Sequence, residues 1–570
     1  MDLAAPAGSR AGPSRWLALD RSTPLWALLA LVLVVLVLLP LAWLLASSLR
    51  GAEGITLRHY LTLATEPQYL QAVRYTLLLG LGVGLLSALV GAPMGWLVAR
   101  TDLPGKRVIR ALVLASFVTP PYLGAFAWTM LAGPNAGFLN KLFRDLTGAE
   151  GHLVNIFTTG GLIFVMFLYS YPYVFTMVAN ALELIPSELE EAAQMLGAGR
   201  SRTALSITLP LAAPALTGGF ILGFLQALTL FGSPAILAMP AGVHTITTRI
   251  WALFQYPPRV EVAAALSLPL LLVAALLLAL QRGWLGRKGY ATVGGRGAAR
   301  QVIPLGPWRW PALGFCLLLL ALAVGFPYLI LAKAAMVRAW AQPLTWENLT
   351  FQNLQFTWEY GATREALWNT LKLGILSATA GVGLATAIAY IVNRGLLRGA
   401  HVLTFLATAP IAIPGVVLAV GLFVAYTQPP LVLYGTVWIL FVAYLTKEMP
   451  IGYAQADATF RGIHPELEDA SRILGAGRVR ALLDVTVPLA RSGVVAAWCF
   501  IFIGAIRELS ASILLFTSQS RVISVVIFDL KEEGHFGAIA VLGLLLLALT
   551  FLVVLGMERV AGRSILGSRE

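Results

Sequence analysis

Charged residues are scarce in this sequence. Only 12% of its 570 residues are charged and 58% are hydrophobic, whereas soluble domains carry about 25% charged residues. The mean hydropathy of +0.80 agrees with this composition. These observations exclude a soluble globular protein and indicate an integral membrane protein.

Cysteine is scarcer still, and its placement excludes two kinds of site. Cys316 and Cys499 both lie inside apolar runs, so we expect neither a disulfide framework nor a cysteine-based metal site. The six histidines show no spacing typical of zinc ligands. We therefore expect no cofactor.

A nucleotide-binding motif is also missing. A P-loop requires Gly-x-x-x-x-Gly-Lys-Ser/Thr, whose backbone amides bind phosphate. The nearest fragment, Gly105-Lys106, has Arg100 where the first glycine should stand. Because no loop approaches the size of a nucleotide-binding domain, any ATP hydrolysis must come from a separate subunit. The chain is not expected to be an enzyme.

Long apolar runs are what the sequence does contain. The run 25–47 has no ionisable residue and exceeds the roughly 20 residues that a membrane-spanning helix needs. A β-barrel would show alternating segments of about 10 residues, and a signal-peptide core is only about 7 to 15 residues long. The sequence therefore predicts an all-α membrane protein whose first run remains as an anchor. About twelve spans are expected, near residues 25–47, 76–98, 109–132, 161–182, 214–238, 262–280, 310–332, 368–392, 402–426, 431–454, 493–516 and 537–557.

The two sets of six spans align with each other. Matching residues early in the two halves are 294 positions apart (370 − 76 = 294). Matching residues later in the halves are 278 positions apart (450 − 172 = 278). The matching positions are Thr76 and Thr370, Arg100 and Arg394, Pro120 and Pro414, Pro172 and Pro450, and Pro210 and Pro488. Because each half has an even number of spans, the duplication is parallel. We expect an N-terminal cytoplasmic tail (1–24), a first module (25–280), a cytoplasmic linker (281–309), a second module (310–557) and a C-terminal cytoplasmic tail (558–570).

The linker fixes the expected orientation in the membrane. It carries six arginine or lysine residues and neither aspartate nor glutamate, so the positive-inside rule places it in the cytoplasm. The arginines of the N-terminal tail and of the short turns around 106 and 394 agree. The net charge of +13 is therefore a topology signal, and nucleic acid is not an expected partner.

An acidic stretch appears once in each half, after the fourth span. "ELEEAAQMLGAG" begins at Glu188 and "ELEDASRILGAG" at Glu466. Ser187 and Glu190 have the spacing of a capping box, and Gly197 stands where a left-handed residue ends a helix. Leu189, Ala192, Ala193 and Leu196 fall on one narrow face. Ordinary connectors at the membrane surface would explain one copy, but two copies at equivalent positions favour a docking role.

The repeated stretch resembles the EAA loop of the membrane subunits of binding-protein-dependent ABC importers. The first loop, about 184–212, matches the full motif, and the second, about 457–490, matches it in softened form. The residues that the resemblance assigns to coupling are Glu191, Ala192, Ala193, Gly197, Asp469, Ala470, Ser471 and Gly475. The resemblance implies two copies of an ABC ATPase subunit on the cytoplasmic side and a periplasmic or lipid-anchored substrate-binding protein outside, at the bacterial inner membrane.

More narrowly, the chain is similar to the iron(III)-type permeases of this superfamily. The similarity lies in the stretch from Tyr169 through the first EAA loop, and in "RELSASILLF" and "ISVVIFDLKEEGHFGAIA" of the second half. Related fused permeases for thiamine, phosphonates or polyamines share much of this sequence and remain alternatives. An ion-coupled secondary transporter or channel is the alternative from another class, although it would have no use for two docking loops.

Ionisable residues inside two spans of the second half mark a candidate translocation path. These are Lys447 with Glu448 and Arg507 with Glu508, and Tyr171 of the first half joins them as a candidate. An ionisable side chain facing lipid costs roughly 2.5 to 3.5 kcal/mol, so we expect these four to face the protein interior. Counting along the spans predicts different depths for the two pairs. Ion pairs that only fasten neighbouring helices are the structural alternative.

Overall fold

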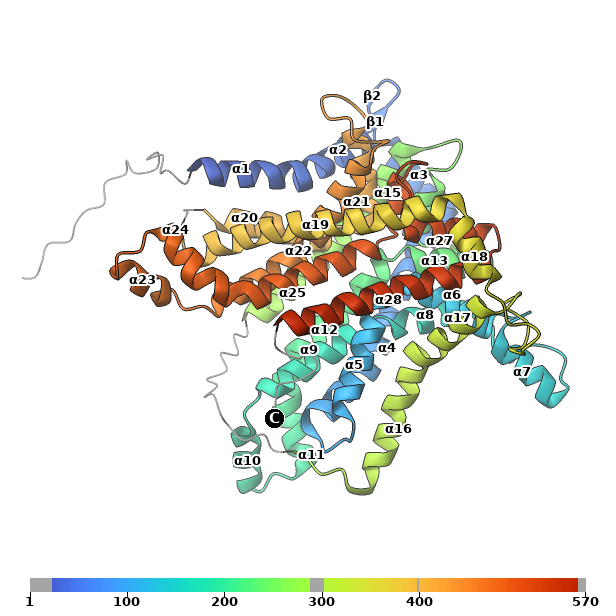
Figure 1. The fold of residues 1–570 in the computed structure, drawn as a ribbon, viewed down its shortest axis with the longest axis horizontal. Coiled ribbons are helices and arrows are strands. Elements are labelled where there is room, and N and C mark those ends of the chain that lie inside the picture. Colours follow the sequence, from blue (N-terminus) through green and yellow to red (C-terminus); the bar gives the residue numbers. More distant parts are fainter. Residues whose placement is uncertain (1–22, 288–301, 397–398, 562–570) are drawn as a thin grey trace, which may run out of the picture.

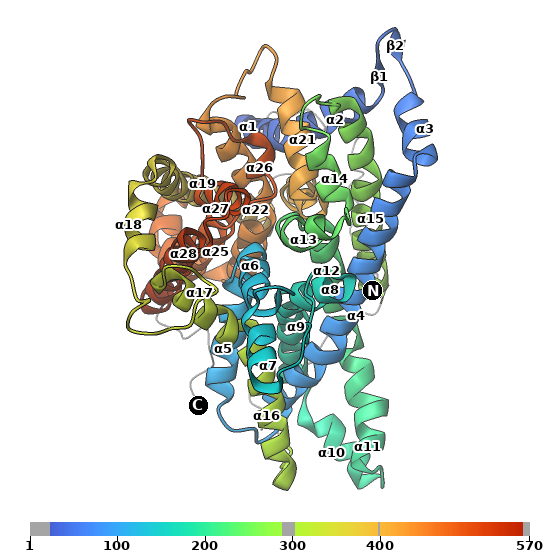
Figure 2. The same ribbon diagram turned by 90° about the vertical axis from the view of Figure 1, so that its right-hand side faces the viewer.

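The computed structural model describes residues 23–287, 302–396 and 399–561, and most of these residues are helical. The N-terminal tail to residue 22, the middle of the linker and the end of the C-terminal tail lie outside the described residues. A short antiparallel hairpin joins β1 (Arg50–Gly51) to β2 (Gly54–Ile55), with Arg50 opposite Ile55. The two halves lie side by side in Figure 2, the first blue to green and the second yellow to red.

The helices of the first half begin in the apolar run after residue 22 and end in the linker. In chain order they are α1 (Thr23–Leu33), η1 (Val34–Leu38), α2 (Leu39–Ser48), α3 (Arg58–Thr65), α4 (Pro67–Arg100), α5 (Lys106–Val118), α6 (Pro121–Ala132), α7 (Phe138–Thr147), α8 (Thr159–Leu168), α9 (Tyr171–Leu184), α10 (Ser187–Met195), α11 (Arg200–Thr203), η2 (Ala204–Thr208), α12 (Leu209–Thr229), α13 (Gly232–Leu237), η3 (Met239–Ala241), α14 (Ile246–Ala252) and α15 (Val260–Arg287).

The helices of the second half, yellow to red in Figure 1, run from Gly306 to Ala561. They are η4 (Gly306–Trp308), α16 (Arg309–Leu320), η5 (Ala321–Gly325), α17 (Phe326–Met336), α18 (Gln352–Glu359), α19 (Gly361–Asn393), α20 (His401–Thr408), η6 (Ala409–Ala412), α21 (Gly415–Tyr426), α22 (Val437–Arg461), α23 (Glu466–Ile473), α24 (Arg478–Ala481), η7 (Leu482–Thr486), α25 (Val487–Ile506), α26 (Ser512–Leu515), α27 (Ile523–Glu532) and α28 (Phe536–Ala561).

Each half is built around the same three helices. In the first half α4 packs against α9 and α12, and in the second α19 packs against α22 and α25. The two halves also share an individual hydrogen bond. The Ile246 amide donates to Thr76 Oγ1 over 2.8 Å in the first half, and the Ile523 amide donates to Thr370 Oγ1 over 2.9 Å in the second. The predicted internal repeat is therefore present in the packing.

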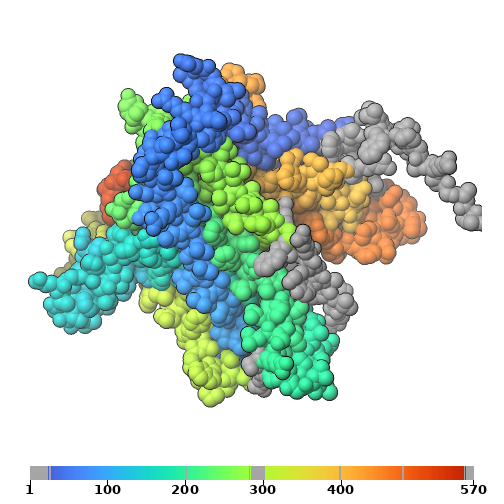
Figure 3. Space-filling model, turned by 180° about the vertical axis from the view of Figure 1, so that it is seen from behind, coloured from blue at the N-terminus to red at the C-terminus, as the bar shows by residue number. Residues whose placement is uncertain are grey.

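The first span of each half packs against the opposite half as well as its own. Helix α2 lies between α15 and α21, and α17 lies between α28 and α6. At the first crossing a Cβ added to Gly421 would lie 2.8 Å from the Pro40 carbonyl oxygen, and the Tyr426 hydroxyl donates to the Val35 carbonyl over 2.8 Å. Figure 3 shows the reverse face, where blue α3 and α4 run beside green α15. The exchange of first spans interlocks the two halves.

Among the residues that the structure describes, fewer than twelve helices qualify as continuous spans. Eight are long and apolar enough, or eleven if each of three bent pairs counts as one span. The predicted span 109–132 is bent by 98° between α5 and α6, and 402–426 is bent by 112° before α21. The remaining predicted span, 431–454, only overlaps α22 (Val437–Arg461), and Lys447 and Glu448 lower the mean hydropathy of that helix. Twelve spans are therefore not confirmed, because proline-containing breaks and paired charges interrupt the apolar runs.

Proline also explains four widened helical turns. The π-helical segments η1, η2, η5 and η7 each end two residues before a proline, at Pro40, Pro210, Pro327 and Pro488. A proline cannot donate a backbone hydrogen bond, and its ring clashes with the carbonyl four residues earlier. One extra residue in the preceding turn moves that carbonyl away. Two of these turns occupy equivalent places, where each repeated acidic loop returns to a long helix.

The described end of the linker is tied to the first half. Ile303 forms a parallel bridge with Thr101, and its amide donates to the Arg100 carbonyl over 2.8 Å. The Leu305 amide donates to Asp102 Oδ1 over 2.8 Å. Residues 303–305, which lead into the second half, are therefore bound to the end of α4.

Candidate functional site: two surface helices and a central cavity

The repeated acidic stretches form two short helices, α10 and α23, on one side of the molecule. Figure 1 shows both at the left, away from α7 and α18 at the right. Gly197 has φ +83° and Gly475 has φ +95°, a region that other residues rarely adopt. The amide after each glycine donates back to Ala193 or Ser471, which closes the helix end. The predicted glycine stop is confirmed in both halves.

Both helices end in exposed apolar side chains. Met195 and Leu196 are 90% and 89% exposed in the first half, and Ile473 and Leu474 are 85% and 89% exposed in the second. The residues assigned to coupling are partly or fully exposed in both copies: Glu191, Ala192, Ala193, Gly197, Asp469, Ala470, Ser471 and Gly475. Apolar side chains exposed at equivalent positions of two repeats are typical of an interaction surface.

A buried glutamate holds each surface helix to the long helix of its half. In the first half Thr208 Oγ1 donates to Glu190 Oε1 over 2.6 Å, and Arg100 Nη2 lies 3.6 Å from the same oxygen. Arg100 also donates to the Ile185 carbonyl over 2.9 Å. The widened turn η2 supplies Thr208, so the proline-induced distortion places a hydroxyl against the carboxylate.

The second half repeats this network with a shorter contact between arginine and glutamate. Glu468 Oε1 accepts from Thr486 Oγ1 over 2.6 Å and from Arg394 Nε over 2.9 Å, and Arg394 Nη2 lies 2.8 Å away. Tyr390 adds a bond to Oε2 over 3.1 Å, and Arg394 reaches the Ile463 carbonyl over 3.1 Å. Burial acts to raise the pKa of Glu468, but the bonds from Thr486 and Arg394 outweigh it and hold the pKa below 4.5.

Sequence reasoning missed these anchors. The capping box expected for Ser187 and Glu190 is wrong, because the N-cap of α10 is Pro186 and the Glu190 carboxylate turns to Thr208 and Arg100. The signal was present, since Arg100 and Arg394 recur at the early spacing of the repeat. Glu190 and Glu468 recur at the later one (468 − 190 = 278).

A cavity of about 580 Å³ lies between the halves. Its walls come from all three bent spans, from the breaks after α12 and α25, and from the middle of α22. The lining residues include Phe117, Tyr122, Tyr169, Tyr173, Gln226, Thr229, Leu230, Gly415, Lys447, Glu448, Gln455, Gly504, Arg507 and Glu508. Four predicted path residues thus meet at one cavity, whereas Tyr171 is fully buried and is not among its lining residues.

The charges in the cavity meet at one level. Lys447 forms an ion pair with Glu508, and Glu508 Oε1 accepts from the Ala511 amide over 2.9 Å. The predicted difference in depth between the two pairs is wrong for two reasons. Helix α22 begins at Val437, so Lys447 lies only about 15 Å along it at 1.5 Å per residue. Helix α25 ends at Ile506, where the sequence suggested a continuous span.

The second half also reaches across the cavity to the first. Arg507 Nη1 donates to the Phe117 carbonyl over 2.8 Å, and its guanidinium lies 5.5 Å from the centre of the Phe117 ring. The ion pair of Lys447 joins α22 to the segment after α25, as the structural alternative for these charges proposed. Subtracting 278 gives their first-half counterparts, the neutral residues Tyr169, Ser170, Thr229 and Leu230.

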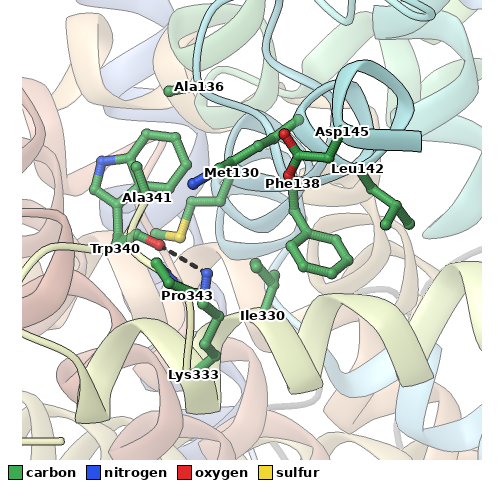
Figure 4. A pocket seen from close by; sticks show the side chains of 11 residues that line it. Met130, Ala136, Phe138, Leu142, Asp145, Ile330, Lys333, Trp340, Ala341 and Pro343 are labelled. Atoms are coloured by element: carbon green, nitrogen blue, oxygen red, sulfur yellow. Dashed lines mark hydrogen bonds between the residues drawn. The ribbon is translucent and has the colours of Figure 1, made fainter. Parts of the chain in front are cut away.

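A smaller pocket of about 100 Å³ lies between α7 and α17, where the first half meets the second (Figure 4). Lys333 Nζ donates to the Trp340 carbonyl over 3.1 Å and lies 5.5 Å from the centre of the Phe138 ring.

Within the described part of the chain no group of three His, Cys, Asp or Glu residues could hold a metal ion.

Comparison with known proteins matches both halves to one family. The model of the binding-protein-dependent transport system inner membrane component matches residues 91–289 and 377–565. The ferric transport system permease protein FbpB of Actinobacillus pleuropneumoniae is 24% identical over 94% of this chain and 78% of its own. The molybdenum transport system permease protein ModB of Escherichia coli (strain K12) is 31% identical over 39% of this chain and 95% of its own.

Among solved structures, a bacterial ABC transporter involved in the import of the acidic polysaccharide alginate is 21% identical. The match covers 47% of this chain and 97% of that chain, with a TM-score of 0.39.

Proposed function

Because this chain belongs to the family of binding-protein-dependent transport system inner membrane components, we propose that it is a transmembrane permease subunit of an ATP-driven importer. ModB aligns with 39% of this chain over 95% of its own length, about the length of one module, whereas this chain carries two modules that interlock through their first spans. It spans the bacterial inner membrane, with α10 and α23 facing the cytoplasm.

In this proposal α10 and α23 each dock one copy of an ABC ATPase subunit. The exposed pairs Met195 with Leu196 and Ile473 with Leu474 supply the apolar contact, and the buried Glu190 and Glu468 fix each helix to the long helix behind it. A rigid connection of this kind transmits movement of the ATPase to the cavity wall. The equivalence of the two anchored helices is the observation that carries the proposal.

The central cavity is the proposed translocation path, and its cargo is delivered by a substrate-binding protein on the opposite face. Lys447, Glu448, Arg507 and Glu508 line it, whereas Tyr171 is buried at the start of α9 and is not among the lining residues. Iron(III) is the proposed cargo, because three relatives that align along most of the chain are ferric transport permeases. Thiamine, phosphonate and polyamine are the alternative cargoes of the same importer class.

Co-purification with the partner ATPase tests the proposal directly. A wild-type chain should retain the ATPase through affinity purification, and replacing both Leu196 and Leu474 by aspartate should abolish retention without changing membrane insertion. Leu552, 66% exposed on a spanning helix, gives the matched control when replaced by alanine. Retention of the ATPase by the double aspartate variant would contradict the docking assignment, and so would uptake of cargo without ATPase or ATP.

A further inference from the structure

One carbonyl at the bend of a first-half span has no possible donor within its own helix. Phe117 lies in the last turn of α5, and the residues three and four positions further along are Pro120 and Pro121. These are the positions whose amides would bond to the Phe117 carbonyl in a helix. Proline has no amide hydrogen, so the donor must come from another part of the chain.

The donor comes from the opposite half. Arg507, directly after α25, donates through Nη1 to the Phe117 carbonyl over 2.8 Å, and its guanidinium lies 5.5 Å from the centre of the Phe117 ring. The repeat does not provide the reverse contact. The first-half counterpart of Arg507 is Thr229 (507 − 278 = 229), and the second-half counterpart of Pro121 is Gly415 (121 + 294 = 415), which has an amide. The bond therefore ties the second half to the first in one direction only.

This bond lies at the end of the cavity away from α10 and α23. Helix α25 begins beside the loop that carries α23, and its 20 residues place Arg507 about 30 Å from that side. At the same end Tyr122 of the first half and Leu509 of the second are both buried. A Cβ added to Gly232 would lie 2.6 Å from Tyr122 Cβ and 3.1 Å from Leu509 Cδ2. The two halves thus pack closely and close the cavity on the side that is proposed to face outwards.

A second acceptor for Arg507 lies within its own half. The Glu448 carboxylate is buried and lines the cavity, and among the residues that the structure describes none donates a hydrogen bond or forms an ion pair to it. A Cβ added to Gly504 would lie 2.1 Å from Glu448 Oε2, so the carboxylate packs directly against α25. Gly504 precedes Arg507 by three residues, and positions three apart are neighbours on a helix. Lys447, the other nearby cation, is already paired with Glu508.

Arg507 therefore has two acceptors within reach and is bonded to one of them. The Phe117 carbonyl belongs to the first half and the Glu448 carboxylate to the second. Separation of the halves at this end would remove the carbonyl, and a buried guanidinium without a partner is costly. Glu448 can take over, because a bond between two charged groups is stronger than a bond to a neutral carbonyl.

We propose that Arg507 is a gating residue that exchanges partners. It bonds to the Phe117 carbonyl while the outer end of the cavity is closed, and it pairs with Glu448 when that end opens. The exchange holds the halves together in the first state and stabilises their separation in the second. The inference rests on the proposed function, because it assigns the exchange to the opening of the proposed translocation path.

A cysteine at Ser510 measures the opening of the outer end. Ser510 is 7% exposed and lines the cavity beside Leu509. The Ser510→Cys change is made in a chain whose buried cysteines, Cys316 and Cys499, are replaced by alanine, and the chain is co-expressed with the ATPase. A membrane-impermeant maleimide is added outside right-side-out membrane vesicles, with or without ATP inside them. ATP should accelerate labelling, because opening exposes residue 510 to the outside.

The variants test whether two side chains act as one pair. Glu448→Gln should slow labelling at least tenfold, because the open state loses its ion pair. In an Arg507→Gln background the same change should have no further effect, because the partner of Glu448 is already absent. Arg507→Lys keeps the charge and should preserve the sensitivity to Glu448→Gln. Glu365→Gln, which removes an exposed carboxylate from α19, is the matched control and should leave labelling unchanged.

An equal effect of Glu448→Gln in the wild-type and Arg507→Gln backgrounds would overturn the inference, and so would the absence of labelling in every background. Retention of the ATPase is measured on the same membranes. If ATP accelerates labelling but the two positions act independently, the exchange is wrong and the importer role stands. If the two positions are coupled but the ATPase is not retained and ATP has no effect, the proposed function fails and the exchange remains.

Discussion

Replacing Glu468 by alanine tests how firmly α23 is held to α19. The change removes the carboxylate that accepts hydrogen bonds from Arg394, Thr486 and Tyr390. The Arg394 guanidinium keeps its hydrogen bond to the Ile463 carbonyl but loses its ion pair. Breaking a buried ion pair costs about 3–5 kcal/mol. Because the two side chains retain 7% and 11% exposure, we take the lower end, about 3 kcal/mol. This corresponds to roughly a 100-fold rise in the population with α23 detached.

Hydrogen–deuterium exchange of the α23 amides measures that population. Exchange should accelerate in Glu468→Ala, and uptake of cargo should fall because α23, the proposed docking helix, no longer moves with α19. Glu466→Ala is the matched control, since the Glu466 side chain is 85% exposed on the same helix. Combining Arg394→Met with Glu468→Leu should recover most of the lost protection, because no unpaired charge remains. Equal exchange in the two single alanine variants would refute the anchoring role.

The same anchor should respond to acid. The pKa of Glu468 is lowered in the folded protein, so its contribution to the stability of α23 is fully present above the ordinary value of 4.5. The contribution is lost as the pH falls through the lowered pKa. Protection of the α23 amides, corrected for intrinsic exchange, should therefore be constant near neutral pH and decline below about pH 4.5, whereas Glu468→Ala should show no such decline. A constant protection factor in the wild type down to pH 2 would contradict this account.

Three further outcomes are expected. Valine at Gly197 or Gly475 forces a β-branched residue into a left-handed conformation at a cost of roughly 1 kcal/mol or more, so uptake should collapse while insertion persists; normal uptake with normal ATPase retention would argue against docking. A cysteine at Ser187 should react with a membrane-impermeant maleimide only from the cytoplasmic side and one at Asn135 only from outside; labelling of the first from outside would overturn the topology. Gln at Glu508 should weaken the link to Lys447 and cut uptake while assembly is retained, and unchanged uptake in a well-assembled variant would remove Glu508 from the path.

The sequence alone identified a membrane protein, its duplication and its two repeated acidic loops. Each depends on local information: apolar runs long enough to span a bilayer, a spacing repeated along the chain, and a glycine where a helix must stop. The glycine stops at Gly197 and Gly475 have positive φ in the structure, because a helix ends for reasons that lie within a few residues. The functional assignment of those loops came from resemblance and remains a proposal.

Only the tertiary structure decided which side chains meet. Glu190 lies beside Glu191 in the sequence, but burial against Arg100 and Thr208 gives it a different role. The sequence contains the prolines at 120 and 414, where two spans bend. A proline only removes one hydrogen bond, however, and packing against the opposite half sets the direction of the helix that follows. Lys447 pairs with Glu508, 61 residues away, because a helix ends in mid-path at Ile506. Such contacts depend on where whole helices lie, and no local pattern of residues records that.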